Sequence, residues 1–136
     1  MSHATEIRVR WGDTDAGGLI YYPQFFHYVI IGLNDYLSLA TDGHHPMEYY
    51  RKRGFLLPAV EADAAFYSPL RAGDRITIET TVPEHGTASL TVGFAISRAQ
   101  ELVADGEVTF VFVNDDFEPT SLPEEIQQCI RTREGD

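Results

Sequence analysis

The amino-acid sequence predicts an α+β fold in which a five-stranded antiparallel sheet wraps around one long helix. Three observations lead to this prediction. Residues 23–40 form one long apolar segment that is opened by a proline. Five other segments carry strand patterns, mostly alternations of apolar and polar residues. The last four of these follow one another with short turns between them, which favours antiparallel pairing.

The composition is that of an ordinary globular chain, and its 136 residues favour a single domain over residues 1–136. No run of about 18 apolar residues occurs, so we expect no membrane partner. The first residues lack the basic and apolar regions of a secretory signal. One cysteine, Cys129, excludes an internal disulfide and suits a reducing compartment, so we expect a cytoplasmic protein.

The formal net charge of −11 argues against nucleic-acid and anionic-membrane partners. It leaves room for a compact anionic ligand held by a local group of arginines. Nine of the ten basic residues are Arg, the residue type better suited to bidentate contacts with phosphate.

The first predicted strand covers residues 5–11. Its alternation places Ile7, Val9 and Trp11 on one face, with arginines on the other. This pattern is typical of a half-buried strand, so we expect the three apolar side chains to face the core.

The predicted long helix begins near Pro23, which suits a first helical turn, and extends to about Ala40. Apolar side chains cover nearly its whole circumference: Phe25, Phe26, Tyr28, Val29, Ile30, Ile31, Leu33, Tyr36, Leu37 and Leu39. A helix that is apolar on all sides is expected to be buried over most of its surface.

A short helix over residues 46–53 is predicted next, with Gly54 as its stop. The remaining predicted strands cover residues 56–67, 75–84, 88–98 and 102–114, and Pro123 opens a last short helix. One sheet cannot cover every face of the long helix. The sequence therefore predicts a homo-oligomer, either a dimer or a tetramer, in which a partner closes the core and the edge strands.

The stretch Gly12-Asp13-Thr14-Asp15-Ala16-Gly17-Gly18 precedes the long helix. Asp13 and Asp15 point in opposite directions if the segment is extended, so they should have different roles. Gly17 and Gly18 allow a tight turn and a close approach to a ligand. From these residues alone, a solvated turn remains the alternative reading.

The start of the helix near Tyr22 offers unpaired backbone N–H groups and a positive dipole potential. Both favour a developing oxyanion. A carboxylate beside such donors suffices to attack a thioester, with no metal or cofactor required.

This stretch, followed by Tyr21-Tyr22-Pro23 and the apolar helix, resembles the 4-hydroxybenzoyl-CoA thioesterase family of hotdog-fold enzymes. The resemblance extends along most of the chain and includes Phe66-Tyr67-Ser-Pro-Leu-Arg-Ala-Gly-Asp74 before a strand. It implies a hotdog fold, an acyl-CoA substrate and thioester hydrolysis.

The resemblance also implies roles for single residues. Asp15 matches the catalytic aspartate of the family, as nucleophile or general base. Tyr22 matches the position whose backbone N–H polarises the carbonyl, while the proposed substrate contact of Gly17 and Gly18 rests on the tight turn described above. Asp13 matches a structural acid expected to bond the loop backbone.

Other positions depart from the family pattern. The acidic motif is also similar to the Tol-Pal-associated branch, which usually has His where Tyr22 stands. The 4-hydroxybenzoyl-CoA enzymes bind the substrate hydroxyl with a helix acid, and the matching position here is Ile30, which cannot accept that bond. Relatives place Arg and Lys before the fourth strand for the CoA phosphates. Here only Ser89 is a candidate contact, with Arg71 or Arg98 as substitutes.

Two rival functions belong to other classes. The first is a hotdog protein that binds an acyl-CoA or acyl-carrier thioester without hydrolysing it. The second is a dehydratase, which needs a His–acid pair that neither His27 nor His85 offers recognisably. A metal is not expected, because the adjacent His44 and His45 are a poor match to zinc-ligand spacing.

Overall fold

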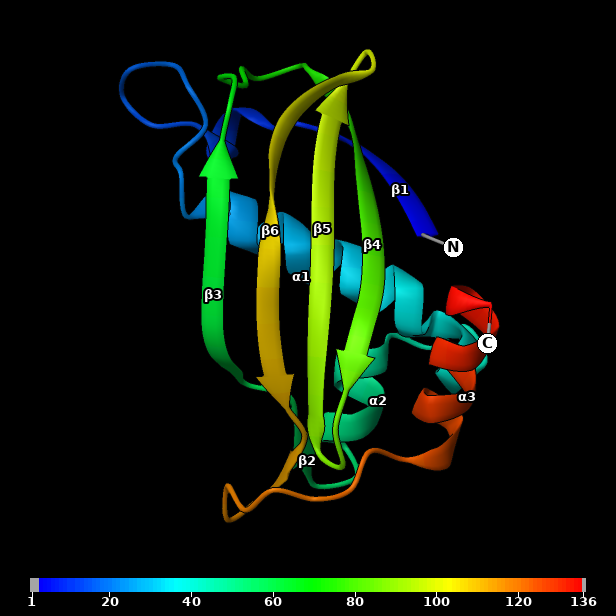
Figure 1. The fold of residues 1–136 in the computed structure, drawn as a ribbon. Helices are drawn as coiled ribbons and strands as arrows, with labels where there is room; N and C mark the ends of the chain where they lie inside the picture. Colours follow the sequence, from blue (N-terminus) through cyan, green and yellow to red (C-terminus); the bar gives the residue numbers. More distant parts are fainter. Residues whose placement is uncertain (1–2, 136) are drawn as a thin grey trace.

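The computed structural model describes residues 3–135, which form a curved antiparallel sheet with a long helix across its concave side (Figure 1). The strand order is β1-β4-β5-β6-β3, which leaves β1 and β3 at the two edges. The five strands of this sheet are β1 (His3–Arg8), β3 (Ala59–Phe66), β4 (Arg75–His85), β5 (Ser89–Arg98) and β6 (Glu101–Val111). The predicted fold class, a five-stranded antiparallel sheet around a long helix, is confirmed.

The long helix α1 (Gln24–Leu37) packs against the sheet chiefly through β4. Alternate residues of the central strands face it and are buried, among them Ile78, Leu90 and Val92. Gly32 lets the helix backbone approach β4 closely. A Cβ at this position would lie 2.5 Å from Oγ1 of Thr80 and 2.9 Å from Cγ2 of Ile78.

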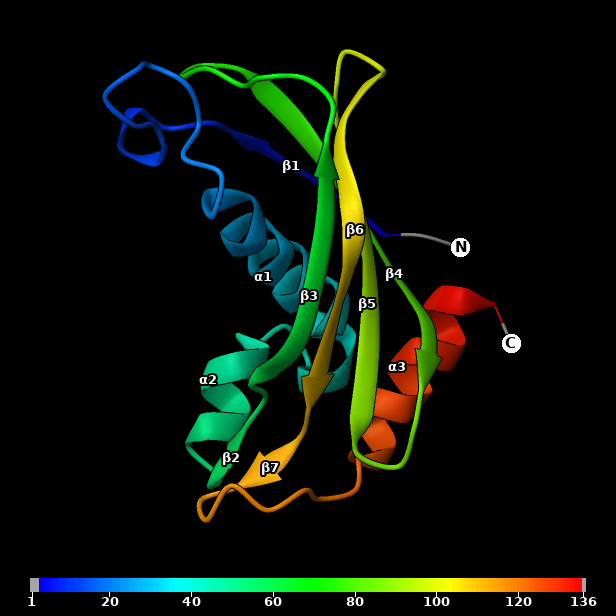
Figure 2. The same cartoon turned by 60° about the vertical axis from the view of Figure 1, so that its left-hand side comes forward.

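Two smaller layers close the lower end of the molecule (Figure 2). The short helix α2 (Pro46–Arg51) precedes β2 (Phe55–Leu56), which pairs with β7 (Val113–Asn114). The last helix, α3 (Glu124–Glu134), buries Ile126 and Ile130 beside the end of α1. Glu134 of α3 accepts hydrogen bonds from the hydroxyl of Tyr36 at 2.6 Å and from the backbone N–H of Val82 at 3.0 Å.

The edge strand β1 is tied to α1 by the carboxylate of Asp35. Its Oδ2 lies 2.7 Å from Nε2 of His3 and accepts a hydrogen bond of 2.6 Å from the hydroxyl of Thr5. These contacts hold the sheet edge against the C-terminal half of the helix.

The structure corrects the prediction that Trp11 faces the core. Strand β1 ends at Arg8, and the chain turns into a 3₁₀ helix over Trp11–Asp13, so the alternation no longer holds and Trp11 is 85% exposed. The expected strand 56–67 is interrupted at Pro58, which separates β2 from β3.

The burial of α1 is less complete than its apolar circumference predicts. Ile30 and Ile31 remain half-buried on the side of the helix turned away from the sheet. Although α1 is apolar, no helix within residues 3–135 has both the length and the hydropathy needed to cross a membrane.

Replacing Gly32 by Ala should lower the free energy of unfolding by about 1–3 kcal/mol, because the added methyl overpacks the interface between α1 and β4. Chemical denaturation measures this change. Gly12→Ala is the control, since a Cβ there meets no atom within 4 Å.

Adding Thr80→Ala to Gly32→Ala should restore part of the loss. The double substitution removes the closest clashing atom, a buried hydroxyl without a hydrogen-bond partner among the described residues. Equal stability of Gly32→Ala and the unmodified chain would contradict the close packing described above.

Candidate active site

The segment between β1 and α1 folds into a narrow loop that is closed by backbone hydrogen bonds. The N–H of Tyr21 donates to the carbonyl of Asp13 at 3.0 Å, and the N–H of Asp15 donates to the carbonyl of Leu19 at 2.8 Å. A further bond, from the N–H of Ile20 to the carbonyl of Leu70 at 2.9 Å, ties the loop to the turn before β4. The loop therefore brings Asp15 and the start of α1 to one end of the sheet (Figure 1).

The carboxylate of Asp13 is the buried anchor of this loop. It is only 5% exposed, and its Oδ2 accepts hydrogen bonds from the backbone N–H of Arg10 at 3.0 Å and from the hydroxyl of Tyr28 at 2.9 Å. Burial raises the pKa of Tyr28, and the bond to Asp13 raises it further. The hydroxyl therefore stays protonated and donating. The prediction that Asp13 bonds the loop backbone is confirmed.

Asp15 points the other way and is exposed. Its Oδ1 accepts a hydrogen bond of 2.8 Å from the N–H of Gly17, while Oδ2 has no hydrogen bond to a described residue. Gly18 has a φ of +81°, a conformation that a side chain would strain. The two glycines thus fold the turn around a carboxylate that keeps one oxygen open.

Tyr22 lies between this loop and the helix. Within residues 3–135 its backbone N–H has no hydrogen-bond partner, whereas its carbonyl accepts from the N–H of Phe25 at 3.2 Å. Pro23 follows as the cap of α1 and has no N–H of its own. The N–H of Tyr22 is therefore an open donor at the positive end of the helix.

A cavity of about 390 Å³ borders the start of α1. Its lining is mostly apolar and aromatic: Leu19, Ile20, Tyr22, Phe25, Phe66, Tyr67, Ser68 and Pro69. The ring centroids of Phe25 and Phe66 lie 4.9 Å apart, and those of Tyr22 and Phe66 lie 6.5 Å apart. The sequence predicts no site role for Phe66, although the run that begins there is part of the family resemblance.

Of the predicted site residues, Tyr22 alone lines this cavity; Asp15, Gly17 and Gly18 lie in the adjoining loop, and Ile30 and Ser89 lie elsewhere. Ile30 lines a separate surface cavity of about 600 Å³ on the outer side of α1. Ser89 begins β5 at the far end of the sheet (Figure 1), where its hydroxyl accepts a hydrogen bond of 3.1 Å from the N–H of Gly86. One chain therefore brings together Asp15, Gly17, Gly18 and Tyr22, but not Ile30 or Ser89.

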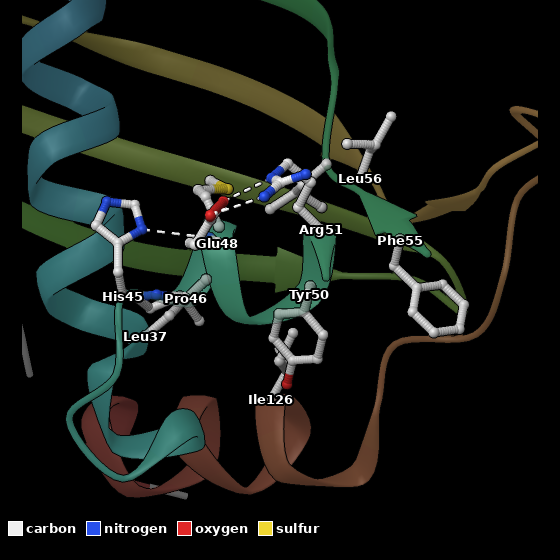
Figure 3. A pocket seen from close by; sticks show the side chains of 11 residues that line it. Leu37, His45, Pro46, Glu48, Tyr50, Arg51, Phe55, Leu56 and Ile126 are labelled. Carbon is white, nitrogen blue, oxygen red and sulfur yellow. Dashed lines mark hydrogen bonds and ion pairs between the residues drawn. The ribbon is translucent and has the colours of Figure 1, made fainter. Parts of the chain in front are cut away.

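A further cavity, of about 200 Å³, lies among α2, β2 and the ends of α1 and α3 (Figure 3). Most of its lining is apolar, and none of the predicted site residues contributes to it. At its rim Nδ1 of His45 accepts from the N–H of Glu48 at 3.3 Å, and Glu48 holds Arg51 at 2.6 Å (Figure 3). Residues 3–135 contain no group of three or more His, Cys, Asp or Glu side chains placed to hold a metal ion.

Comparison with known proteins gives a consistent result. A family model described as the thioesterase-like superfamily matches residues 9–130. A 1,4-dihydroxy-2-naphthoyl-CoA hydrolase of Crocosphaera subtropica is 26% identical over 132 residues, which cover 94% of this chain and 95% of that protein.

Solved structures share the fold. A 1,4-dihydroxy-2-naphthoyl-CoA thioesterase from Synechocystis superposes with a TM-score of 0.84 at 25% identity, covering 96% of each chain. A 4-hydroxybenzoyl-CoA thioesterase superposes with a TM-score of 0.82 at 22% identity, covering 95% of this chain and 98% of the other. The family resemblance inferred from the sequence is confirmed.

Tyr28→Phe should lower the free energy of unfolding by about 1–3 kcal/mol, because the buried carboxylate of Asp13 loses a donor that solvent cannot replace. The amides of Asp15 and Tyr21 should also exchange faster with solvent. Chemical denaturation and hydrogen exchange measure the two effects.

Tyr49→Phe serves as the control, since its hydroxyl makes no hydrogen bond to a described residue, and the change should stay within about 0.5 kcal/mol. An unchanged exchange rate at Asp15 in Tyr28→Phe would show that the anchor does not hold the loop.

Proposed function

The chain belongs to the thioesterase-like superfamily and is an acyl-CoA thioesterase, and we propose that Asp15 and the backbone N–H of Tyr22 hydrolyse an aromatic acyl-CoA. One observation carries this proposal. An exposed carboxylate oxygen and an open backbone donor, both without hydrogen-bond partners among residues 3–135, belong to the same closed loop.

The proposed chemistry has two possible routes. In the first, Oδ2 of Asp15 attacks the thioester carbonyl carbon, the C–S bond breaks, CoA leaves as the thiolate, and water then hydrolyses the mixed anhydride. In the second, Asp15 removes a proton from a water molecule that attacks the same carbon. Either route forms a tetrahedral oxyanion, which the N–H of Tyr22 would stabilise. Neither route needs a cofactor, since CoA is part of the substrate.

The aromatic class of the acyl group is proposed from the cavity beside Tyr22. Rings of Tyr22, Phe25 and Phe66 line it, and aromatic rings favour offset or edge contacts with other rings. The named relatives that act on 1,4-dihydroxy-2-naphthoyl-CoA agree with an aromatic substrate.

A homo-oligomer is also proposed, built on the free edge of the sheet. Within residues 3–135 strand β3 pairs only with β6, and Val60 and Phe66 on it are exposed. Antiparallel pairing of β3 with its counterpart in a second copy would set the lower end of one chain beside the upper end of the other. This arrangement would bring the Ser89 end of the partner toward Asp15 and would also cover the exposed edge.

Asp15→Asn should fold normally and lose about 10²–10⁴-fold in kcat on an aromatic acyl-CoA, because the amide can neither attack nor accept the proton. Release of the CoA thiol measures the rate. Asp116→Asn, an exposed turn carboxylate, is the matched control and should keep full activity.

Full activity of a folded Asp15→Asn variant would overturn the mechanism. Binding of acyl-CoA by the unmodified chain without thiol release on any aromatic or aliphatic thioester would favour the non-hydrolytic alternative. Faster hydrolysis of aliphatic than of aromatic thioesters would be compatible with the proposed mechanism but would contradict the proposed aromatic substrate class.

Sedimentation of the unmodified chain should give a dimer or a tetramer, and Val60→Lys should shift it toward the monomer. A charge on an edge strand opposes pairing with a second strand. Glu61→Lys would also change the charge of β3, so it cannot serve as a control. Asp116→Lys, in an exposed turn outside β3, tests instead for a general effect of charge. A monomeric unmodified chain with full activity would contradict this arrangement.

A further inference from the structure

Strands β1 and β4 place two arginines directly opposite each other at the edge of the sheet. Arg8 is paired in register with Arg75, so both side chains are on the same face, and both are exposed. Neither guanidinium has a hydrogen bond or an ion pair with a described residue, including Glu6, which lies on that face two residues away. Like charges directly opposite each other destabilise a strand pair, so this pair needs another explanation.

Two further arginines lie at the same corner. The backbone bonds Val9 N to Asp74 O and Gly73 N to Val9 O, both 2.8 Å, hold the turn before β4 against the end of β1. That turn carries Arg71, whose exposed side chain has no hydrogen bond or ion pair with a described residue, although its charge acts on the nearby carboxylate of Asp74. Arg10 follows β1, and its guanidinium is 71% exposed and reaches Asp13 only at 3.6 Å.

Trp11 completes the group, which we call the arginine corner: Arg8, Arg10, Trp11, Arg71 and Arg75. The ring of Trp11 is 85% exposed, and Trp11 is the only tryptophan of the chain. It begins the 3₁₀ helix that ends at the buried Asp13. A large exposed aromatic ring beside exposed guanidinium groups is suited to stacking on a planar ligand that carries anions.

Most of the other arginines among residues 3–135 are less available. Arg98 is held by Asp74 at 3.0 Å and Glu101 at 2.9 Å, and Arg51 is held by Glu48. Arg53 lies 3.6 Å above the ring of Tyr49 and also bonds a carbonyl.

The hairpin at residues 85–89, where the family resemblance indicated phosphate contacts, contains neither Lys nor Arg. In a chain of net charge −11, the arginine corner is therefore the group of neighbouring cations best suited to an anion.

We propose that the arginine corner binds the phosphate groups of the CoA part of the substrate, with the ring of Trp11 stacked on the adenine. The inference rests on the proposed function, in that CoA is the carrier of the acyl group. A phosphate held by bidentate contacts from both Arg8 and Arg75 would offset the repulsion between the two guanidinium groups.

The position of the arginine corner fits this role. Trp11 precedes Asp15 by four residues, and the segment between β1 and α1 that carries both lies at one end of the sheet, beside the turn before β4 (Figure 2). The extended pantetheine arm would lead from the phosphates toward the open N–H of Tyr22. The nucleotide and the reacting carbonyl would then be held by one end of the molecule.

The direct test is a fluorescence titration with adenosine 3′,5′-bisphosphate, a probe that contains no thioester. Emission from Trp11 should change saturably with the probe, and unphosphorylated adenosine should bind much more weakly. Arg8→Ala/Arg75→Ala should weaken binding of the bisphosphate by about tenfold or more. Lys52→Ala, which removes a cation at α2, should leave binding unchanged. No saturable change in the unmodified chain, or equal binding by the double variant, would overturn the proposal.

Kinetics separate binding from folding. The double variant should raise KM for an aromatic acyl-CoA about tenfold while leaving hydrolysis of the matching acyl-pantetheine, which has no phosphate, unchanged. Its melting temperature should stay equal or rise, since two facing like charges are gone. An equal loss on both substrates, or a clear fall in melting temperature, would assign the arginines a structural role instead. Failure of the unmodified chain to hydrolyse either substrate would reject the proposed function, while the titration would still decide the binding site.

Discussion

The bond between the buried carboxylate of Asp13 and the hydroxyl of Tyr28 is the contact on which the candidate site depends. A carboxylate removed from solvent needs donors, and Asp13 finds them in the helix that it precedes and in the backbone of Arg10. The contact joins the loop to the rigid core, because Tyr28 is fully buried between α1 and the sheet. The next acid along, Asp15, is then free to stay at the surface, where it can meet a substrate.

Charge is distributed in a way that suits an anionic ligand arriving at this end. The chain carries 21 acidic residues, which repel anions, while four arginines lie beside the candidate loop. Such a contrast orients a charged ligand before contact, and salt screens it beyond about 10 Å. A single small group of cations is no continuous binding face for a polyanion, so the expectation that nucleic acid does not bind stays a prediction.

Much of the fold could be predicted from the sequence because its periodic segments are long. The alternation through Ile76, Ile78 and Thr80 identifies a strand with one buried face, and the structure has that strand in nearly the predicted bounds. Trp11 was placed wrongly because alternation is a local signal and cannot show where a strand stops. The pairing of Arg8 with Arg75 could not be read from the sequence either, since register depends on how distant segments meet. For the site, Asp13, Asp15 and Tyr22 stand out in the sequence, whereas the cavity formed with Phe66 requires the return of β3 to the same end.

The most direct measurement is a crystal structure of the Asp15→Asn chain with an aromatic acyl-CoA bound. We expect the thioester oxygen to lie about 2.7–3.1 Å from the backbone nitrogen of Tyr22, with the side chain at position 15 facing the carbonyl carbon. A thioester bound instead in the cavity among α1, α2 and α3 (Figure 3), with no contact to Tyr22, would contradict it.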